Sequence, residues 1–95
     1  IDIANQVGTS INAYADGTVT KTAWTDSYGN YIVIDHGGGL ETYYIHLSGF
    51  DVSVGDSVTT GQLIGRMGKT GSATGSHLQF EIRLNGQPQN PWDYL

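Results

Sequence analysis

Apolar and polar side chains alternate along most of this chain with a period of two residues, which is typical of β-strands. The clearest case is segment 77–84, where four apolar residues share one face and four polar residues share the other. The apolar residues are Leu78, Phe80, Ile82 and Leu84, and the polar ones are His77, Gln79, Glu81 and Arg83. Further strands are predicted at 18–24, 31–35, 40–47, 52–54 and 63–67. No segment has a helical period, so the pattern predicts antiparallel strands only.

Turn residues separate these segments. Asp16-Gly17 and Asn85-Gly86 are favoured turn pairs, and the run Gly37–Gly39 predicts a tight reversal between two strands. Glycine supplies 14 of the 95 residues, and charged residues only 14%, against about 25% in ordinary domains. We therefore predict one all-β domain over 1–95: a compact antiparallel sheet, barrel- or sandwich-like, with a groove over the sheet. The predicted core residues are Ile32, Ile34, Leu63, Leu78, Phe80 and Ile82.

Charge and cysteine content exclude several classes of protein. The net charge is −5 with four basic residues, which cannot neutralise a run of nucleic-acid phosphates. The absence of cysteine excludes disulfides and thiolate zinc sites. No apolar run approaches the ~18 residues of a membrane span, so no membrane insertion is expected within this chain. Because the chain begins Ile1-Asp2, we expect a piece of a longer protein, truncated at its N-terminus.

The three histidines are the candidates for metal binding or proton transfer near neutral pH. Taken alone, His36 and His46 each fit a structural role at the end of a strand. His77 differs because it begins the polar face of segment 77–84. Such a face is often simply solvated, but side chains at i and i+2 lie about 7 Å apart and can converge on one ion or substrate atom.

Five segments in order resemble the lysostaphin-type zinc endopeptidases, which cut peptide bonds in bacterial peptidoglycan. The segments are Asp2, Tyr28 to Gly37, Tyr44-Ile45-His46-Leu47-Ser48, Val54 to Gly65, and Thr74 to Arg83. The resemblance extends over the whole chain to Asn90-Pro91-Trp92-Asp93-Tyr94-Leu95. It implies a compact antiparallel β fold with a groove floored by the sheet, located outside the cell or in the cell envelope.

The resemblance also implies site residues. Asp2 matches the aspartate zinc ligand of a His-x-x-x-Asp motif, whose histidine would precede Ile1. Gln79 stands where the family has the second histidine of His-x-His, the third ligand. His46 and His77 match two further family histidines, which orient water and stabilise the oxyanion. The chain thus keeps the aspartate and both catalytic histidines but lacks two of three expected zinc ligands.

A glutamine offers a neutral amide oxygen, whereas zinc prefers nitrogen, sulfur or carboxylate donors. Without a firmly held metal, water keeps a pKa near ~15.7 instead of ~7. We therefore expect zinc to be absent or weakly bound and catalysis to be impaired, with the groove binding a peptidoglycan peptide or an envelope protein.

Two alternatives stay open. The chain could be an active zinc endopeptidase in which another residue replaces Gln79 and the missing histidine lies upstream of residue 1. The segment Val54 to Gly65 is also similar to the turn region of biotinyl and lipoyl carrier domains. Those carriers need an acceptor lysine at a hairpin tip, and the two lysines, Lys21 and Lys69, lack the flanking pattern.

Overall fold

The computed structural model describes residues 1–95 and consists almost entirely of β-strands. Its elements are β1 (Asp2–Ala4), β2 (Ser10–Asn12), β3 (Gly17–Thr25), β4 (Gly29–Asp35), β5 (Leu40–Phe50), β6 (Ser57–Val58), β7 (Leu63–Met67), β8 (His77–Leu84), β9 (Gln87–Gln89) and the 3₁₀ turn Pro91–Asp93. The predicted all-β class is confirmed. No helix is long and apolar enough to cross a membrane.

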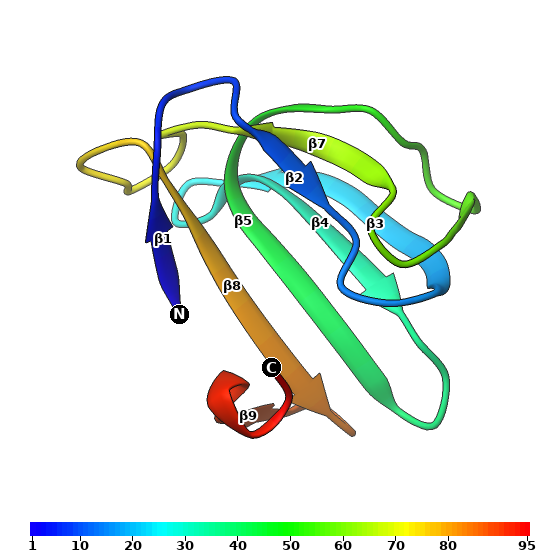
Figure 1. Ribbon diagram of the computed structural model, residues 1–95. Coiled ribbons are helices and arrows are strands. Elements are labelled where there is room, and N and C mark those ends of the chain that lie inside the picture. The colour runs from blue at the N-terminus through cyan, green and yellow to red at the C-terminus, as the bar shows by residue number, and fades with distance from the viewer.

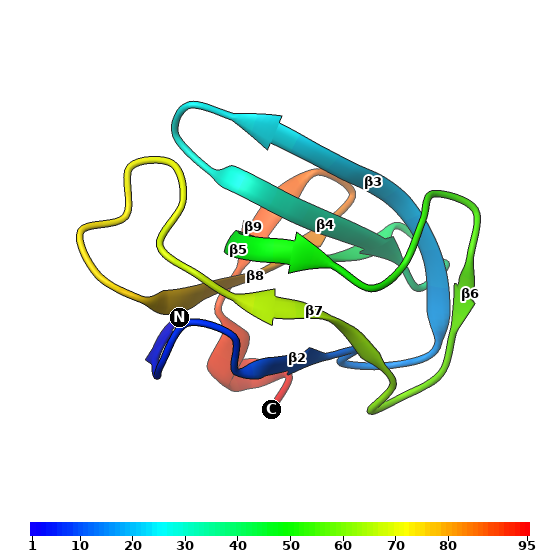
Figure 2. The ribbon, with the colours of Figure 1, turned by 90° about the horizontal axis from the view of Figure 1, so that it is seen from above.

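The strands form one curled antiparallel sheet in which β5 is the central element (Figure 1). The order is β1-β8-β5-β4-β3-β6, with β2 paired to β7 and β9 paired to β8. Residues Leu40 to Ile45 of β5 pair with β8, whereas Leu47 to Phe50 pair with β7. This change of partner along one strand bends the sheet, so that β2 and β7 turn over one face (Figure 2).

The core fills the concave face of this sheet. Thirteen buried residues form it: twelve lie on strands β2 to β8, and Ala13 follows β2 directly. Five of the six predicted core residues belong to it, namely Ile32, Ile34, Leu78, Phe80 and Ile82. The prediction was wrong for Leu63, which is only half-buried, because its neighbour Ile64 points inward and successive side chains of a strand face opposite ways.

A second, smaller apolar cluster lies on the opposite face. Tyr31, Val33 and Ile45 are buried there, with Tyr28 and Tyr43 packed against them. Tyr31 and Tyr43 stack with their rings 2° from parallel. The face that carries the polar side chains of β8 is therefore partly covered by its own aromatic residues.

Turns and short strands account for the remaining differences. Asn85 and Gly86 both have positive φ, at 51° and 80°, and close the β8–β9 hairpin as predicted. The segment 52–54, predicted as extended, is instead a loop that leads into β6. The strands β1, β2, β6 and β9 have two or three residues each, which is too short for an alternating pattern to be visible in the sequence.

Candidate functional site

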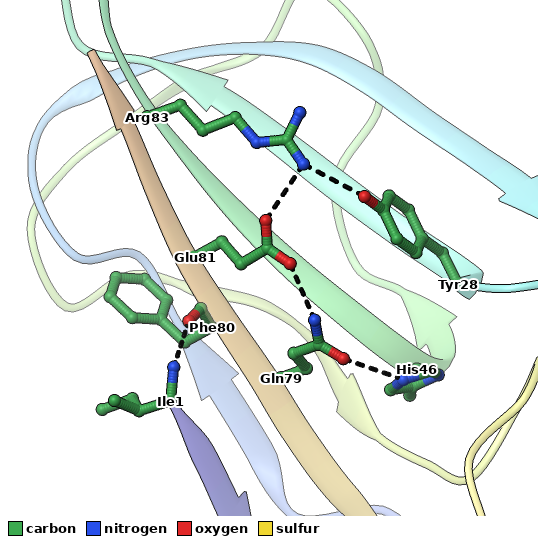
Figure 3. Close-up of polar contacts among 7 residues, drawn as sticks. All are labelled: Ile1, Tyr28, His46, Gln79, Phe80, Glu81 and Arg83. Carbon is green, nitrogen blue, oxygen red and sulfur yellow. Dashed lines mark hydrogen bonds and ion pairs between the residues drawn. The ribbon is translucent and has the colours of Figure 1, made fainter. Parts of the chain in front are cut away.

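His46 owes its position to a bulge in β5. Tyr44 pairs with Phe80 on the core face, and Ile45 pairs with Gln79 on the other face. Strict alternation would return His46 to the core. Instead, the register shifts at this point, His46 adopts a φ of 71°, and Leu47 takes the next core position. The extra residue turns His46 toward Gln79, as Figure 3 shows.

Thr70, in the loop after β7, holds the bulge in place. Its carbonyl lies 2.7 Å from His46 Nδ1, and its hydroxyl donates to the Leu47 carbonyl at 2.7 Å. The same hydroxyl accepts from the Asn30 amide at 3.1 Å. One residue thus ties the loop to both β4 and β5, and His46 is left only 4% exposed.

Two glycines allow this close approach. Gly29 and Gly71 have φ of 63° and 70°. Their backbones lie so close together that a Cβ on either glycine would overlap backbone atoms of the other. A Cβ on Gly29 would overlap Thr70 and lie 2.6 Å from the Gly71 nitrogen. The loop can therefore reach His46 only because both positions lack side chains.

The polar face of β8 is a connected row of hydrogen bonds (Figure 3). Gln79 Nε2 donates to Glu81 Oε2 at 2.7 Å, and Arg83 Nη2 donates to Glu81 Oε1 at 3.0 Å. Arg83 also donates to the Tyr28 hydroxyl at 3.0 Å, and its guanidinium lies 4.0 Å from the centre of the Tyr43 ring. Both carboxylate oxygens of Glu81 therefore accept a hydrogen bond from a neighbour in the row.

Arg83 is a fixed positive charge in this row. Burial acts to lower the pKa of its guanidinium, but the hydrogen bonds to Glu81 and Tyr28 outweigh burial, so the pKa lies above its usual value. The Arg83 and Glu81 side chains are 23% and 25% exposed, so solvent reaches both partners of the ion pair. Their contribution to stability is consequently modest, but their geometry is well defined.

Asp2 and His77 join the same face through the pairing of β1 with β8. Asp2 lies opposite Gln79, and Ala4 lies opposite His77. Directly paired residues of antiparallel strands project to the same side, so the Asp2 carboxylate and the Gln79 amide emerge together. The His77 ring lies 4.8 Å from the His46 ring, measured between centroids, and His77 Nδ1 is 3.0 Å from the Gly75 carbonyl oxygen.

The four residues singled out in the sequence therefore gather at the junction of β1, β8 and β5. Their catalytic and ligand roles stay predictions. Sequence reasoning did not single out Thr70 or Tyr28 as site residues. Tyr28 only begins one of the segments that resemble the family, and Thr70 lies in a glycine-rich loop with no further signal. His36 lies apart, bound to the Asp16 carbonyl and the Thr42 hydroxyl at 2.8 Å each.

The residues present do not fit the zinc centre that the resemblance implies. No group of three or more His, Cys, Asp or Glu side chains comes together to hold a metal ion. Gln79 brings a neutral oxygen, and its amide nitrogen is committed to Glu81. A catalytic zinc ion takes three protein ligands, which Asp2 and Gln79 do not supply.

The one pocket in the surface lies elsewhere. It is open and mostly apolar, and its lining includes Ile1, Tyr14, Phe80 and Leu95. Phe80 and Tyr44, which also lines it, point to the core face of the sheet, away from Gln79. This hollow has no part in the polar site.

Comparison with known proteins decides the family, because the profile of "Peptidase family M23" matches residues 1–91. The chain belongs to peptidase family M23. The M23 match includes the segment 54–65, whose structure is a loop, β6 and the start of β7, so nothing there favours a carrier domain.

Known M23 relatives are similar over nearly the whole chain. The DD-carboxypeptidase/endopeptidase Mpg of Neisseria meningitidis is 47% identical over 96% of this chain, which spans only 21% of Mpg. The catalytic domain of lysostaphin from Staphylococcus simulans superposes with a TM-score of 0.92 at 33% identity, covering 98% of this chain and 74% of that one. A zinc-containing peptidase from Vibrio cholerae gives 0.90 at 36% identity, covering 93% of this chain and 27% of that one.

Proposed function

We propose that this M23 domain is directed to bacterial peptidoglycan and that its groove binds a cell-wall peptide or an envelope protein, with peptide-bond hydrolysis impaired. It would act outside the cell or in the cell envelope. A further relative, the peptidoglycan DD-endopeptidase ShyA of Vibrio cholerae, is 43% identical over 94% of this chain, which supports peptidoglycan as the ligand class. The proposal on impairment rests on this chain's own residues.

The glutamine at position 79 is the main support for impaired hydrolysis. It occupies the β8 position directly opposite Asp2, and its amide bridges Glu81 and His46. Zinc, when bound in a peptidase, supplies a Lewis acid and a water of pKa ~7. His46 and His77 could give general-base assistance of only about 10²–10⁴-fold, which is far less than amide hydrolysis needs.

The polar face of β8 does not depend on a metal. Glu81, Arg83 and Tyr28 hold one another in place, and Tyr43 supports the guanidinium. A peptide laid along β8 would meet a row of amide, carboxylate and guanidinium groups. Such a row can recognise the polar backbone and charged ends of a peptide.

Binding can be tested by calorimetric titration of the chain with soluble muropeptides. We expect binding without turnover, and we expect Arg83→Met to weaken it. Arg66→Met is the matched control, since Arg66 lies on β7 and forms its own ion pair with Asp51 at 3.3 Å. Equal loss in both variants, or no binding at all, would contradict peptide binding along β8.

The alternative is an active zinc endopeptidase whose missing histidine lies upstream of residue 1. The discriminating assay is turbidity clearing of purified cell walls by a chain extended upstream of residue 1. Clearing that a chelator abolishes would favour the active enzyme and defeat the proposed impairment. If the cell walls are not cleared but muropeptides bind, the proposed impairment is supported.

A further inference from the structure

Two neighbours fix which atoms of His46 and Gln79 face each other. The Thr70 carbonyl, which can only accept, lies 2.7 Å from His46 Nδ1, so a neutral imidazole carries its proton there. The Glu81 carboxylate likewise orients the NH₂ group of Gln79 toward itself, 2.7 Å away. The atoms left facing each other are His46 Nε2 and Gln79 Oε1, which are 3.3 Å apart (Figure 3). Both are hydrogen-bond acceptors, so the contact is favourable only when a donor lies beside them.

His77 and Asp2 add to the same end of the polar row. The Gly75 carbonyl lies 3.0 Å from His77 Nδ1 and fixes the ring proton there, which leaves Nε2 as an acceptor. The His77 ring is 4.8 Å from the His46 ring, measured between centres. Asp2 lies directly opposite Gln79 in the pairing of β1 with β8 and brings a negative charge to this side of the sheet. This end of the row therefore offers acceptors and a negative charge.

The other end of the row carries unused donors. An arginine has five N–H groups, and those of Arg83 Nη2 are engaged by Glu81 Oε1 and the Tyr28 hydroxyl at 3.0 Å each. Nη1 donates to no group of the chain, and the side chain is 23% exposed, so a ligand can reach it. Glu81 balances part of the positive charge, which leaves this end with donors and a weakened charge.

The two ends together give the row a polarity that an extended peptide can match. A primary ammonium group carries a positive charge and three N–H donors, and acceptors 3.3 Å apart are close enough to share one N–H. We propose that the amino end of a bound peptide donates to His46 Nε2 and Gln79 Oε1, and that the peptide runs along β8 with its carboxyl end at Arg83.

The length of the row sets the length of peptide that fits. Gln79 and Arg83 are four residues apart in one strand, which is about 13 Å at ~3.3 Å per residue. An extended peptide of about five residues therefore spans both ends. This inference rests on the proposed function, because it specifies the orientation in which the same face would hold a cell-wall peptide.

The test is an NMR titration at pH 7.0 with penta-alanine, which has no charged side chain and whose amino group, with a pKa near ~8, is mostly protonated. We expect the signals of the Gln79 side-chain amide and of His46 Nε2 to shift. N-acetyl-penta-alanine should bind about tenfold more weakly, because a charged donor is lost. Penta-alanine amide should bind only about threefold more weakly, because Glu81 already balances part of the Arg83 charge.

Two variants assign the ends of the peptide. In Gln79→Leu, acetylation of the peptide should have almost no further effect, whereas amidation should still weaken binding. In Arg83→Met the pattern should be reversed. Arg66→Met is the matched control and should retain both effects, since Arg66 pairs with Asp51 on β7 and the loop after β5. If Gln79→Leu does not fold by circular dichroism, Asp2→Asn at an exposed position replaces it and should reduce the effect of acetylation.

The outcomes separate this inference from the proposed function. Acetylation without effect on the unaltered chain, or an effect of acetylation that is lost in Arg83→Met instead of Gln79→Leu, would overturn the orientation. Muropeptide binding without binding of penta-alanine would overturn this inference alone. If neither muropeptides nor penta-alanine binds, the proposed function fails together with it.

Discussion

The contact between Gly29 and the loop at Thr70 can be tested by adding one methyl group. In Gly29→Ala, the new Cβ would overlap backbone and side-chain atoms of Thr70 and lie 2.6 Å from the Gly71 nitrogen. Backbone atoms cannot rotate away, so the loop must move. Moving it removes the hydrogen bonds of Thr70 to Leu47 and Asn30 and separates its carbonyl from His46.

The expected magnitude follows from two effects. An L-residue at a φ of 63° is strained by about 1–2 kcal/mol, and each partly buried hydrogen bond that is lost contributes about 1 kcal/mol. Gly29→Ala should therefore lower the free energy of unfolding by about 3–5 kcal/mol, a large share of the ~5–15 kcal/mol typical of a domain. The assay is urea denaturation followed by tryptophan fluorescence, with the His46 amide monitored by NMR.

Gly37→Ala is the control for backbone strain alone. Gly37 has a φ of 87°, and nothing lies within 4 Å of its Cβ position. The Gly37→Ala variant should lose only about 1–2 kcal/mol of its free energy of unfolding. If Gly29→Ala is no worse than Gly37→Ala, or if the His46 amide signal does not move, the loop does not hold the bulge.

Three more outcomes are expected. Phe80→Ala should lower the free energy of unfolding by about 3–5 kcal/mol, because the ring is 6% exposed in the core; a loss below about 1 kcal/mol in urea denaturation would invert the faces of β8. Gln79→His, in a chain extended so that a histidine lies four positions before Asp2, should bind zinc more tightly than the unaltered chain in calorimetry; no gain would show that the face no longer suits the family ligand set. Burial raises the pKa of Tyr44, so the unfolded chain releases this proton first and stability should fall as pH rises above about 10, by up to ~1.4 kcal/mol per pH unit. Tyr44→Phe should remove that dependence in urea denaturation followed between pH 9 and 11, and an equal fall in both proteins would contradict the assignment.

Alternation in the sequence predicts the longer strands well. The segments at β3, β4, β5, β7 and β8 are each five residues or more. Burial on one face gives β8 its strict alternation, whereas β4 and β5 contain apolar runs that are buried on both faces. Leu63 was misplaced because Leu63 and Ile64 are both apolar and adjacent, so the pattern does not reveal which of the two points inward. The two- and three-residue strands depend on partners distant in the chain, which no local pattern records.

The site residues show the same difference between positions that a local pattern predicts and positions that depend on distant contacts. Parity alone puts His77 and Gln79 on one face, because they are two residues apart in β8. It gives the wrong face for His46, where the bulge reverses the side of the strand. The bulge in turn depends on Thr70, which lies 24 residues further along the chain. Asp2 reaches the site through the pairing of β1 with β8, again a contact between distant segments.

Gln79 makes the site differ from a metal centre in what holds its side chains in place. In a zinc site, like charges and lone pairs converge and the metal holds them together. Here Gln79 ties β8 to Glu81 through its NH₂ group, and Glu81 is bonded to Arg83, so this part of the face is preformed by the chain alone. We therefore expect peptide recognition along β8 to survive chelation, which calorimetric titration with muropeptides in the presence of a chelator would show; binding that the chelator abolishes would mean that the face depends on a metal.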